Sequence, residues 1–169
     1  MTRGHFDHVA DAVALARRTN AKVIANFEIA EWLGAEGLKT CTPSIWAAVF
    51  STTSGMSKLT PALHGSMLPD GSNGGMPNGF LLTLGEKRIY FAGDTALFSD
   101  MKLIGRQPID LAVSPIGDNF TMGPEGALLA LEFLQPKVVI PAHYNTWDLL
   151  NQDAAAWAEK VQEKRGPSR

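Results

Sequence analysis

The chain has 169 residues, of which 45% are hydrophobic and 19% charged, and its formal net charge is −2. This length fits one domain with a buried core, and the composition argues against a disordered protein. The weak negative charge, without a basic run, argues against nucleic acid as a partner, and no apolar stretch approaches the roughly 20 residues of a membrane span.

The chain contains one cysteine, Cys41, so an internal disulfide is excluded. Its start shows no positive segment followed by a hydrophobic one, which is the pattern of a secretory signal. We therefore expect a reducing compartment, the cytoplasm.

Apolar periodicity in the first half predicts helices over residues 7–18 and 28–33, with a short buried strand over 22–25 between them. A strand over 58–63 leads into His64. Residues 71–79 contain too many turn-forming residues for regular structure.

The second half opens with a predicted hairpin, in which strands 80–84 and 88–91 flank a Gly85-Glu86 turn. A strand over 109–113, a helix from Gly123 to 134, a strand over 137–140 and a helix over 147–164 follow. Strands that alternate with helices indicate one layered α/β domain over 1–169, with functional groups in the loops at strand ends.

The four histidines of the chain and two aspartates lie in settings that suit metal ligands. They are His5, Asp7, His8, His64, Asp94 and His143. A hydrolytic zinc site needs imidazoles and carboxylates from several strand ends, with one position left open for water. Taken singly, each residue has a simpler interpretation: Asp7 as a helix cap, Asp94 as a turn former, and a lone histidine as a core or surface residue. Their combination favours a metal site.

These residues and their surroundings resemble the metallo-β-lactamase superfamily. The segment 2–8, His64, the Gly93-Asp94-Thr95 turn and His143 carry this resemblance. The stretches 80–84, 89–98, 118–124 and 141–146 are very similar to its UPF0173 branch of metal-dependent hydrolases. The resemblance implies an αββα sandwich with a divalent metal cofactor, zinc before manganese, and a small-molecule substrate.

The resemblance also implies a role for each ligand. One metal ion would be held by the residue at position 3, His5 and His64, and a second by Asp7, His8 and His143. Asp94 would bridge the two ions, and a hydroxide between them would be the nucleophile. Asp7 would also handle the leaving-group proton, and we expect Asn145 and the 119–121 loop to line the substrate cleft.

The chain departs from the family pattern at three places. Arg3 has no lone pair to offer a metal, so we expect a weakened centre with one or two ions. The motif stands next to Met1, which predicts an N-terminally incomplete sandwich with exposed apolar surface and an unpaired edge. Segment 41–57 lacks the family's glycine-rich, aromatic pattern; a compensated frameshift or a divergent strand pair would explain it, and either predicts poor packing.

Two functions follow from these observations. The first is a metal-dependent hydrolase that uses a metal-bound hydroxide on an unknown substrate, with activity that Arg3 could impair. The alternative is a non-catalytic truncated fragment of such a hydrolase. A metal-binding or redox module without hydrolysis has less support, because the sequence shows no flavin or haem signature. Metal content separates the first two.

Overall fold

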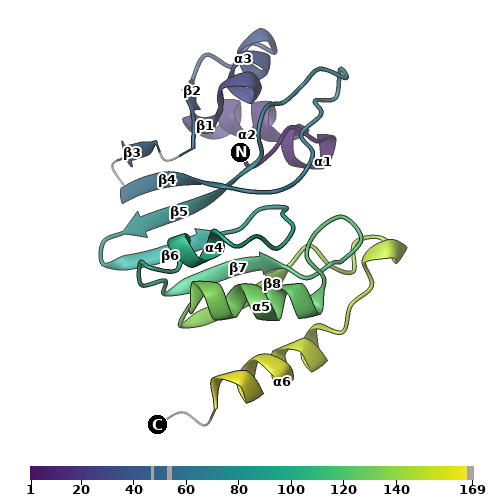
Figure 1. Ribbon diagram of the computed structural model, residues 1–169. Helices are drawn as coiled ribbons and strands as arrows, with labels where there is room; N and C mark the ends of the chain where they lie inside the picture. Colours follow the sequence, from purple (N-terminus) through teal and green to yellow (C-terminus); the bar gives the residue numbers. More distant parts are fainter. Residues whose placement is uncertain (47, 53–54, 167–169) are drawn as a thin grey trace.

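The computed structural model describes residues 1–46, 48–52 and 55–166, and it contains two β-sheets (Figure 1). The smaller sheet pairs two parallel strands, β1 (Val23–Asn26) and β2 (Cys41–Ser44). The larger sheet has the order β3-β4-β5-β6-β7-β8. Its strands are β3 (Val49–Thr52), β4 (Gly55–Pro61), β5 (Asn78–Leu84), β6 (Lys87–Phe91), β7 (Leu111–Pro115) and β8 (Val138–Ala142).

The strand directions bring four strand ends to one edge of the larger sheet. β4 and β6 both pair antiparallel with β5, so they run in the same direction. β7 and β8 continue that direction, because β6, β7 and β8 pair in parallel. The carboxyl ends of β4, β6, β7 and β8 therefore meet at the same edge, where the predicted metal ligands follow.

The helices are α1 (Phe6–Val9), α2 (Ala12–Thr19), α3 (Phe27–Ala35), α4 (Met101–Ile104), α5 (Pro124–Leu134) and α6 (Ala154–Arg165). The prediction of one helix over 7–18 is wrong, because the chain divides into α1 and α2 between Val9 and Ala12. The last helix begins later than predicted: a 3₁₀ turn (Asp148–Leu150) precedes α6, and Asp153 caps α6 by accepting from the Ala156 N–H at 2.9 Å. No helix in the described ranges is long and apolar enough to cross a membrane.

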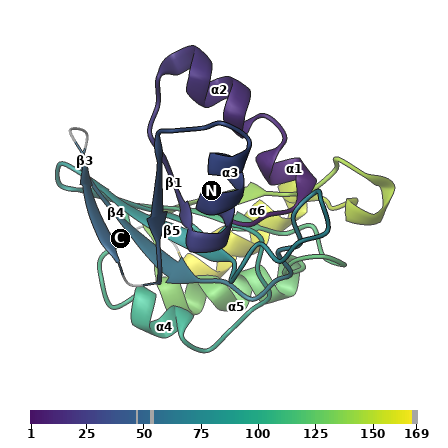
Figure 2. The same cartoon turned by 90° about the horizontal axis from the view of Figure 1, so that it is seen from above.

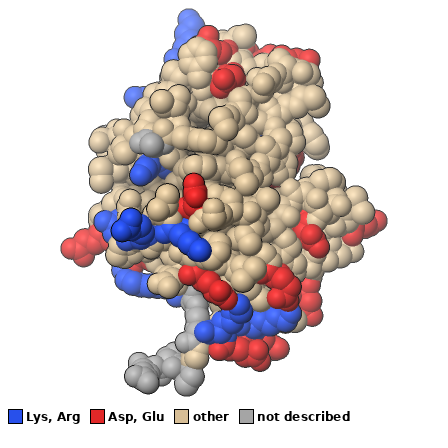
Figure 3. Space-filling model, viewed as in Figure 1, with Lys and Arg blue, Asp and Glu red and all other residues tan. Residues whose placement is uncertain are grey.

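Helices α4 and α5 cover one face of the larger sheet. Tyr90 and Ala112 from the strands are fully buried against Met101 of α4 and Leu134 of α5. Helix α6 packs on α5 through Trp157, and ion pairs cross between these helices where Figure 3 shows red and blue side chains side by side. Helices α1–α3 and β1 lie on the side of the sheet away from α4 and α5 (Figure 2).

The other face of the larger sheet carries exposed apolar side chains. Successive residues of a strand point to opposite faces. Tyr90 and Val139 pack with the α4–α5 core, so Phe91, Val138 and Ile140 point to the other face. Their exposed fractions are 38%, 54% and 47%. These three residues give this face of the sheet a partly exposed apolar surface.

Segment 41–57 forms paired strands in its described part. β2 pairs with β1, and β3 pairs antiparallel with β4 at one end of the larger sheet. Ile45 of this segment is 71% exposed and Val49 is 57% exposed, whereas Ser44 and Ser57 are buried. Positions 47, 53 and 54 of this segment lie outside the described residues.

Candidate metal centre

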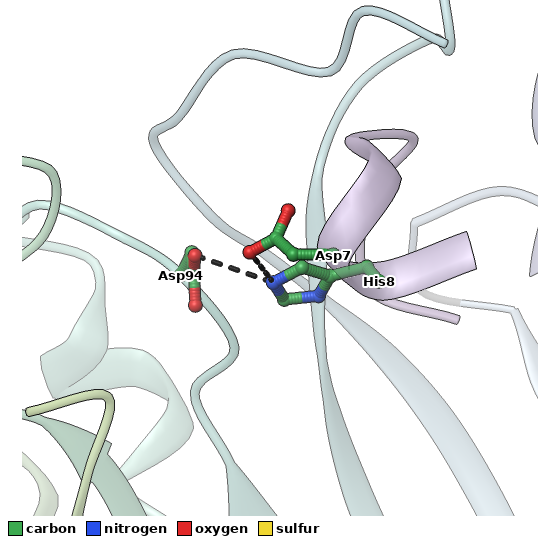
Figure 4. Close-up of side chains that lie close together, drawn as sticks. All are labelled: Asp7, His8 and Asp94. Atoms are coloured by element: carbon green, nitrogen blue, oxygen red, sulfur yellow. Dashed lines mark ion pairs between the residues drawn. The ribbon is translucent and has the colours of Figure 1, made fainter. Parts of the chain in front are cut away.

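The predicted ligands come together from two directions at the sheet edge. His64 follows β4, Asp94 follows β6, and His143 directly follows β8. The N-terminal segment approaches from the other side and brings residues 3–8 with α1. Figure 4 shows Asp7 and His8 on α1 pointing toward Asp94.

Hydrogen bonds to distant residues fix the N-terminal segment. The Asn78 N–H donates to the Thr2 carbonyl at 2.8 Å, and the Gly4 N–H donates to Ser66 Oγ at 2.9 Å. A Cβ at Gly4 would lie 3.1 Å from the Leu68 side chain, so the backbone of residue 4 passes close to that loop. These contacts hold the residues between them in place beside the sheet.

The His8 ring is oriented by Thr2, which lies in the same N-terminal segment. Its Nδ1 lies 2.8 Å from Thr2 Oγ1, so the Thr2 hydroxyl engages one side of the ring. The other nitrogen, Nε2, faces the carboxylates of Asp7 and Asp94 at 3.5 and 3.4 Å. A partner on one imidazole nitrogen commonly sets which nitrogen is left to bind a metal.

The distances between these groups fit a single divalent ion. His143 Nε2 lies 3.1 Å from Asp94 Oδ2, and the ligand atoms of Asp7, His8 and Asp94 all lie within 4.8 Å of one another. Four nitrogen and oxygen ligands around zinc, each about 2.1 Å from the ion, stand about 3.4 Å apart at the corners of a tetrahedron. Asp7, His8 and Asp94 therefore form a donor set of suitable chemistry and spacing, and His143 adds an imidazole beside Asp94.

Asp94 is the charged centre of this cluster, and its exposed fraction is only 5%. Burial disfavours its charge, but hydrogen bonds from His143 and His8 and the positive charge of Arg3 outweigh burial and hold the pKa of Asp94 well below its usual range. The same hydrogen bond from His143 to Asp94 raises the pKa of His143 above its ordinary value. The carboxylate is thus ionised and able to act as a ligand.

Arg3 is buried inside the cluster, with an exposed fraction of 4%. Its Nη2 lies 2.6 Å from Asp94 Oδ2 and 3.0 Å from Asp7 Oδ2. His5 and His64 lie beside one another, with ring centroids 5.3 Å apart, but the third position of their set is this guanidinium. The residues predicted for a first metal ion therefore lack a third ligand. Those predicted for the second have the chemistry of metal ligands, and in the chain without metal the Arg3 nitrogen pairs with the Oδ2 atoms of Asp7 and Asp94 in that set.

A cavity of about 690 Å³ opens beside the cluster. Arg3, His5, Asp7, His64 and His143 contribute its polar wall, and its remaining wall is apolar, formed by Phe6, Met67, Leu68, Pro69, Phe120, Trp147 and Leu149. Phe120 lines the cavity as expected from the sequence. The Asn145 side chain has another role, because its Oδ1 accepts from the Gln152 N–H at 2.7 Å.

Sequence reasoning missed two parts of this site. The contact between Thr2 and His8 spans six residues, and the i, i+6 spacing is no recognised signal for a side-chain pair. Apart from Phe120, the apolar wall comes from three separate segments, near Phe6, Met67 and Trp147, and no periodic pattern links them in the sequence. A regular pattern would have been needed to find either from sequence.

Known proteins share both the sequence and the fold. The family model described as "Beta-lactamase superfamily domain" matches residues 1–144 of this chain. A UPF0173 metal-dependent hydrolase of Thermus thermophilus is 50% identical over 164 residues, which cover 97% of this chain and 72% of the relative. A UPF0173 metal-dependent hydrolase of Bacillus mycoides is 49% identical over 172 residues, which cover 98% and 75%.

Among solved structures, Igni18, a metallo hydrolase from Ignicoccus hospitalis, is similar with a TM-score of 0.89 and 34% identity. The match covers 98% of this chain and 71% of Igni18. The metallo-β-lactamase-fold protein YhfI of Bacillus subtilis shares the fold at a TM-score of 0.68 with 15% identity. The expected fold is confirmed, and the identity of about 50% over nearly the whole chain places this protein in the UPF0173 metal-dependent hydrolases of the β-lactamase superfamily.

Proposed function

We propose that this chain is a hydrolase in which Asp7, His8, Asp94 and His143 hold a divalent metal ion, and that hydroxide bound to this ion attacks a small substrate. The observation that carries the proposal is the closeness of imidazole and carboxylate. His8 Nε2 lies 3.5 Å from Asp7 and 3.4 Å from Asp94, and His143 Nε2 lies 3.1 Å from Asp94. The mixed nitrogen and oxygen donors favour zinc, with manganese as the second choice.

The bound ion would supply a nucleophile at neutral pH, because a divalent cation lowers the pKa of its water to about 7. The protein residues would then balance the charge of the ion and transfer the proton. Asp94 is buried and ionised, so it would keep the positive charge of the centre in balance. Asp7 lies at the exposed side of the cluster and lines the cavity, so its carboxylate would take the proton of the attacking hydroxide and pass it to the leaving group.

The cavity walls support a substrate with an apolar group. Among its lining residues, charge is confined to Arg3 and Asp7, with three imidazoles beside them, and the other side chains are aliphatic, aromatic, proline or thioether. Apolar walls exclude water and give little to a charged substrate, so the substrate class is a small, uncharged molecule with an alkyl or aryl group next to the bond that is cleaved.

Turnover by the zinc-loaded chain tests this proposal. Uncharged chromogenic esters, lactones and thioesters with aryl groups form the substrate panel, with a phosphodiester as the charged comparison. We expect turnover that a chelator abolishes and zinc restores. Asp7→Asn should lower kcat/KM at least about 100-fold, because both a ligand and the proton donor are lost.

The matched control is Asp11→Asn, which changes an exposed acid on the neighbouring helix that makes no side-chain capping bond. It should leave kcat/KM unchanged. Absence of metal-dependent turnover on every substrate, together with absence of bound metal, would support the alternative of a non-catalytic member of the family.

A further inference from the structure

Arg3 occupies a position that needs an explanation, because a buried guanidinium is costly unless it is paired. It pairs with both carboxylates of the cluster through a single nitrogen, Nη2, at 2.6 Å from Asp94 and 3.0 Å from Asp7. Within the described part of the chain, its Nε and Nη1 are buried without a hydrogen-bond partner. The side chain is thus held in the cluster by its charge.

The backbone around Arg3 directs it into the cluster. The carbonyl of Thr2, just before Arg3, accepts a hydrogen bond from the Asn78 N–H. The N–H of Gly4, just after it, donates one to Ser66 Oγ. Arg3 precedes α1, which begins at Phe6, and its side chain reaches back to Asp7 in the first turn of that helix at 3.0 Å. Its inward position is therefore built into the segment.

We propose that the Arg3 guanidinium is a built-in cation that replaces one metal ion, so that this centre binds a single divalent ion. The proposal rests on the hydrolase function proposed above. Asp94 Oδ2 has room for few cations in direct contact, and Nη2 of Arg3 already lies 2.6 Å from this atom. A second dication next to His5 and His64 would meet this fixed positive charge and would find only two imidazoles.

A guanidinium suits this role because it cannot be deprotonated in proteins and has no lone pair. It brings one positive charge where a metal ion would bring two. Asp7 and Asp94 are therefore held together even without metal, while His5 and His64 stay available to contact the substrate in the cavity. Arg3 is a positioning residue for the two carboxylates.

Metal stoichiometry tests this inference directly. Apo-protein is titrated with Co²⁺ while the visible absorption of the bound ion is followed, and the zinc content of reconstituted protein is measured by mass spectrometry. We expect the wild-type chain to saturate at about one ion and Arg3→His at about two, because the histidine completes the set with His5 and His64. Arg3→Gln should stay at one, since it removes the charge and adds no imidazole.

The matched control is Arg18→His, an exposed arginine of α2, which should also stay at one ion. Two ions in the wild-type chain would overturn the inference, and this measurement needs no variant that might misfold. Two ions with turnover would leave the proposed hydrolase intact and sink the role of Arg3. One ion in the wild-type chain without turnover on any substrate would support the role of Arg3 and contradict the proposed hydrolase function.

Discussion

His143 reaches Asp94 from a left-handed backbone conformation, with φ of 55°, which non-glycine residues adopt at a steric cost. The loop that follows β7 holds it there. The Ile116 N–H donates to the Ala142 carbonyl at 3.0 Å, and Gly117 packs directly on the His143 backbone. A Cβ at Gly117 would lie 2.0 Å from the His143 carbonyl oxygen. The position of this ligand thus depends on a glycine outside the metal cluster.

Gly117→Ala should therefore weaken metal binding. The added methyl must displace the His143 backbone, and loss of such support around a metal ligand typically costs about 10- to 100-fold in affinity. Calorimetric titration with zinc measures this Kd. The control is Gly126→Ala in α5, where the nearest atom to a new Cβ is 3.6 Å away. An unchanged Kd for Gly117→Ala would show that the loop adapts without moving His143.

At the scale of single residues, the sequence predicted identities better than partners. All six predicted metal-site residues converge at one place, and Arg3 was predicted to be no ligand because of its chemistry alone. Its ion pairs with Asp7 and Asp94 could not be predicted, because they depend on how the N-terminal segment crosses the sheet edge. Residue type determines what a side chain can bind, whereas the fold determines what it meets.

At the scale of elements, periodicity and turn chemistry predicted the β5–β6 hairpin and helix α5 in the second half, but not helix α4. The hairpin of β5 and β6 turns at Gly85 with φ of 59°, as a glycine allows, and pairs Leu84 with Lys87. The break between α1 and α2 was missed, because one apolar stripe runs through both helices and neither proline nor glycine separates them. Strand pairing in segment 41–57 was also beyond periodicity, since neither β2 nor β3 alternates between buried and exposed side chains.

One acidic residue joins three strands of the larger sheet. Asp110, just before β7, accepts from the Arg88 N–H of β6 at 2.9 Å and pairs with Lys137, just before β8, at 2.9 Å. The Arg88 hydrogen bond first, and then Lys137, lower the pKa of Asp110 to about 2. The folded chain thus prefers the ionised carboxylate, and this contribution to stability exists above about pH 4.

Asp110→Asn should lower the Tm at neutral pH. The contribution of Asp110 is lost as the pH falls through its folded pKa of about 2, so the difference in Tm between variant and wild type should shrink from pH 5 to pH 2. Calorimetric melts across this range measure it. Asp11→Asn serves as the control and should match the wild type throughout. A difference that stays constant with pH would mean that the side-chain amide, rather than the lost charge, disturbs the sheet.

At the scale of the whole molecule, the metal centre lies between two parts of the chain that have separate hydrophobic cores. Asp7 and His8 belong to α1, which packs in a core with α2 and α3. Asp94 and His143 belong to the edge of the larger sheet, whose core is shared with α4 and α5. An ion bound by all four residues therefore ties one core to the other.

Metal removal should lower the stability of the whole chain for this reason. Zinc at about 100 times its Kd stabilises the folded state by about 2.7 kcal/mol, which is roughly 5 to 10 °C in Tm for a chain of this size. Melts with zinc and with a chelator measure this shift. His64→Ala should keep it, because His64 lies outside the proposed donor set, whereas Asp94→Asn should lose it.

The role of Arg3 adds a second expectation to the same melts. Without metal, the guanidinium still holds Asp7 and Asp94 together across the two cores. The chelated Arg3→Gln chain should therefore melt below the chelated wild type, and zinc should raise its Tm by a larger amount. Equal shifts in both chains would mean that Arg3 does not substitute for an ion, because a built-in cation must make the metal-free fold less dependent on metal.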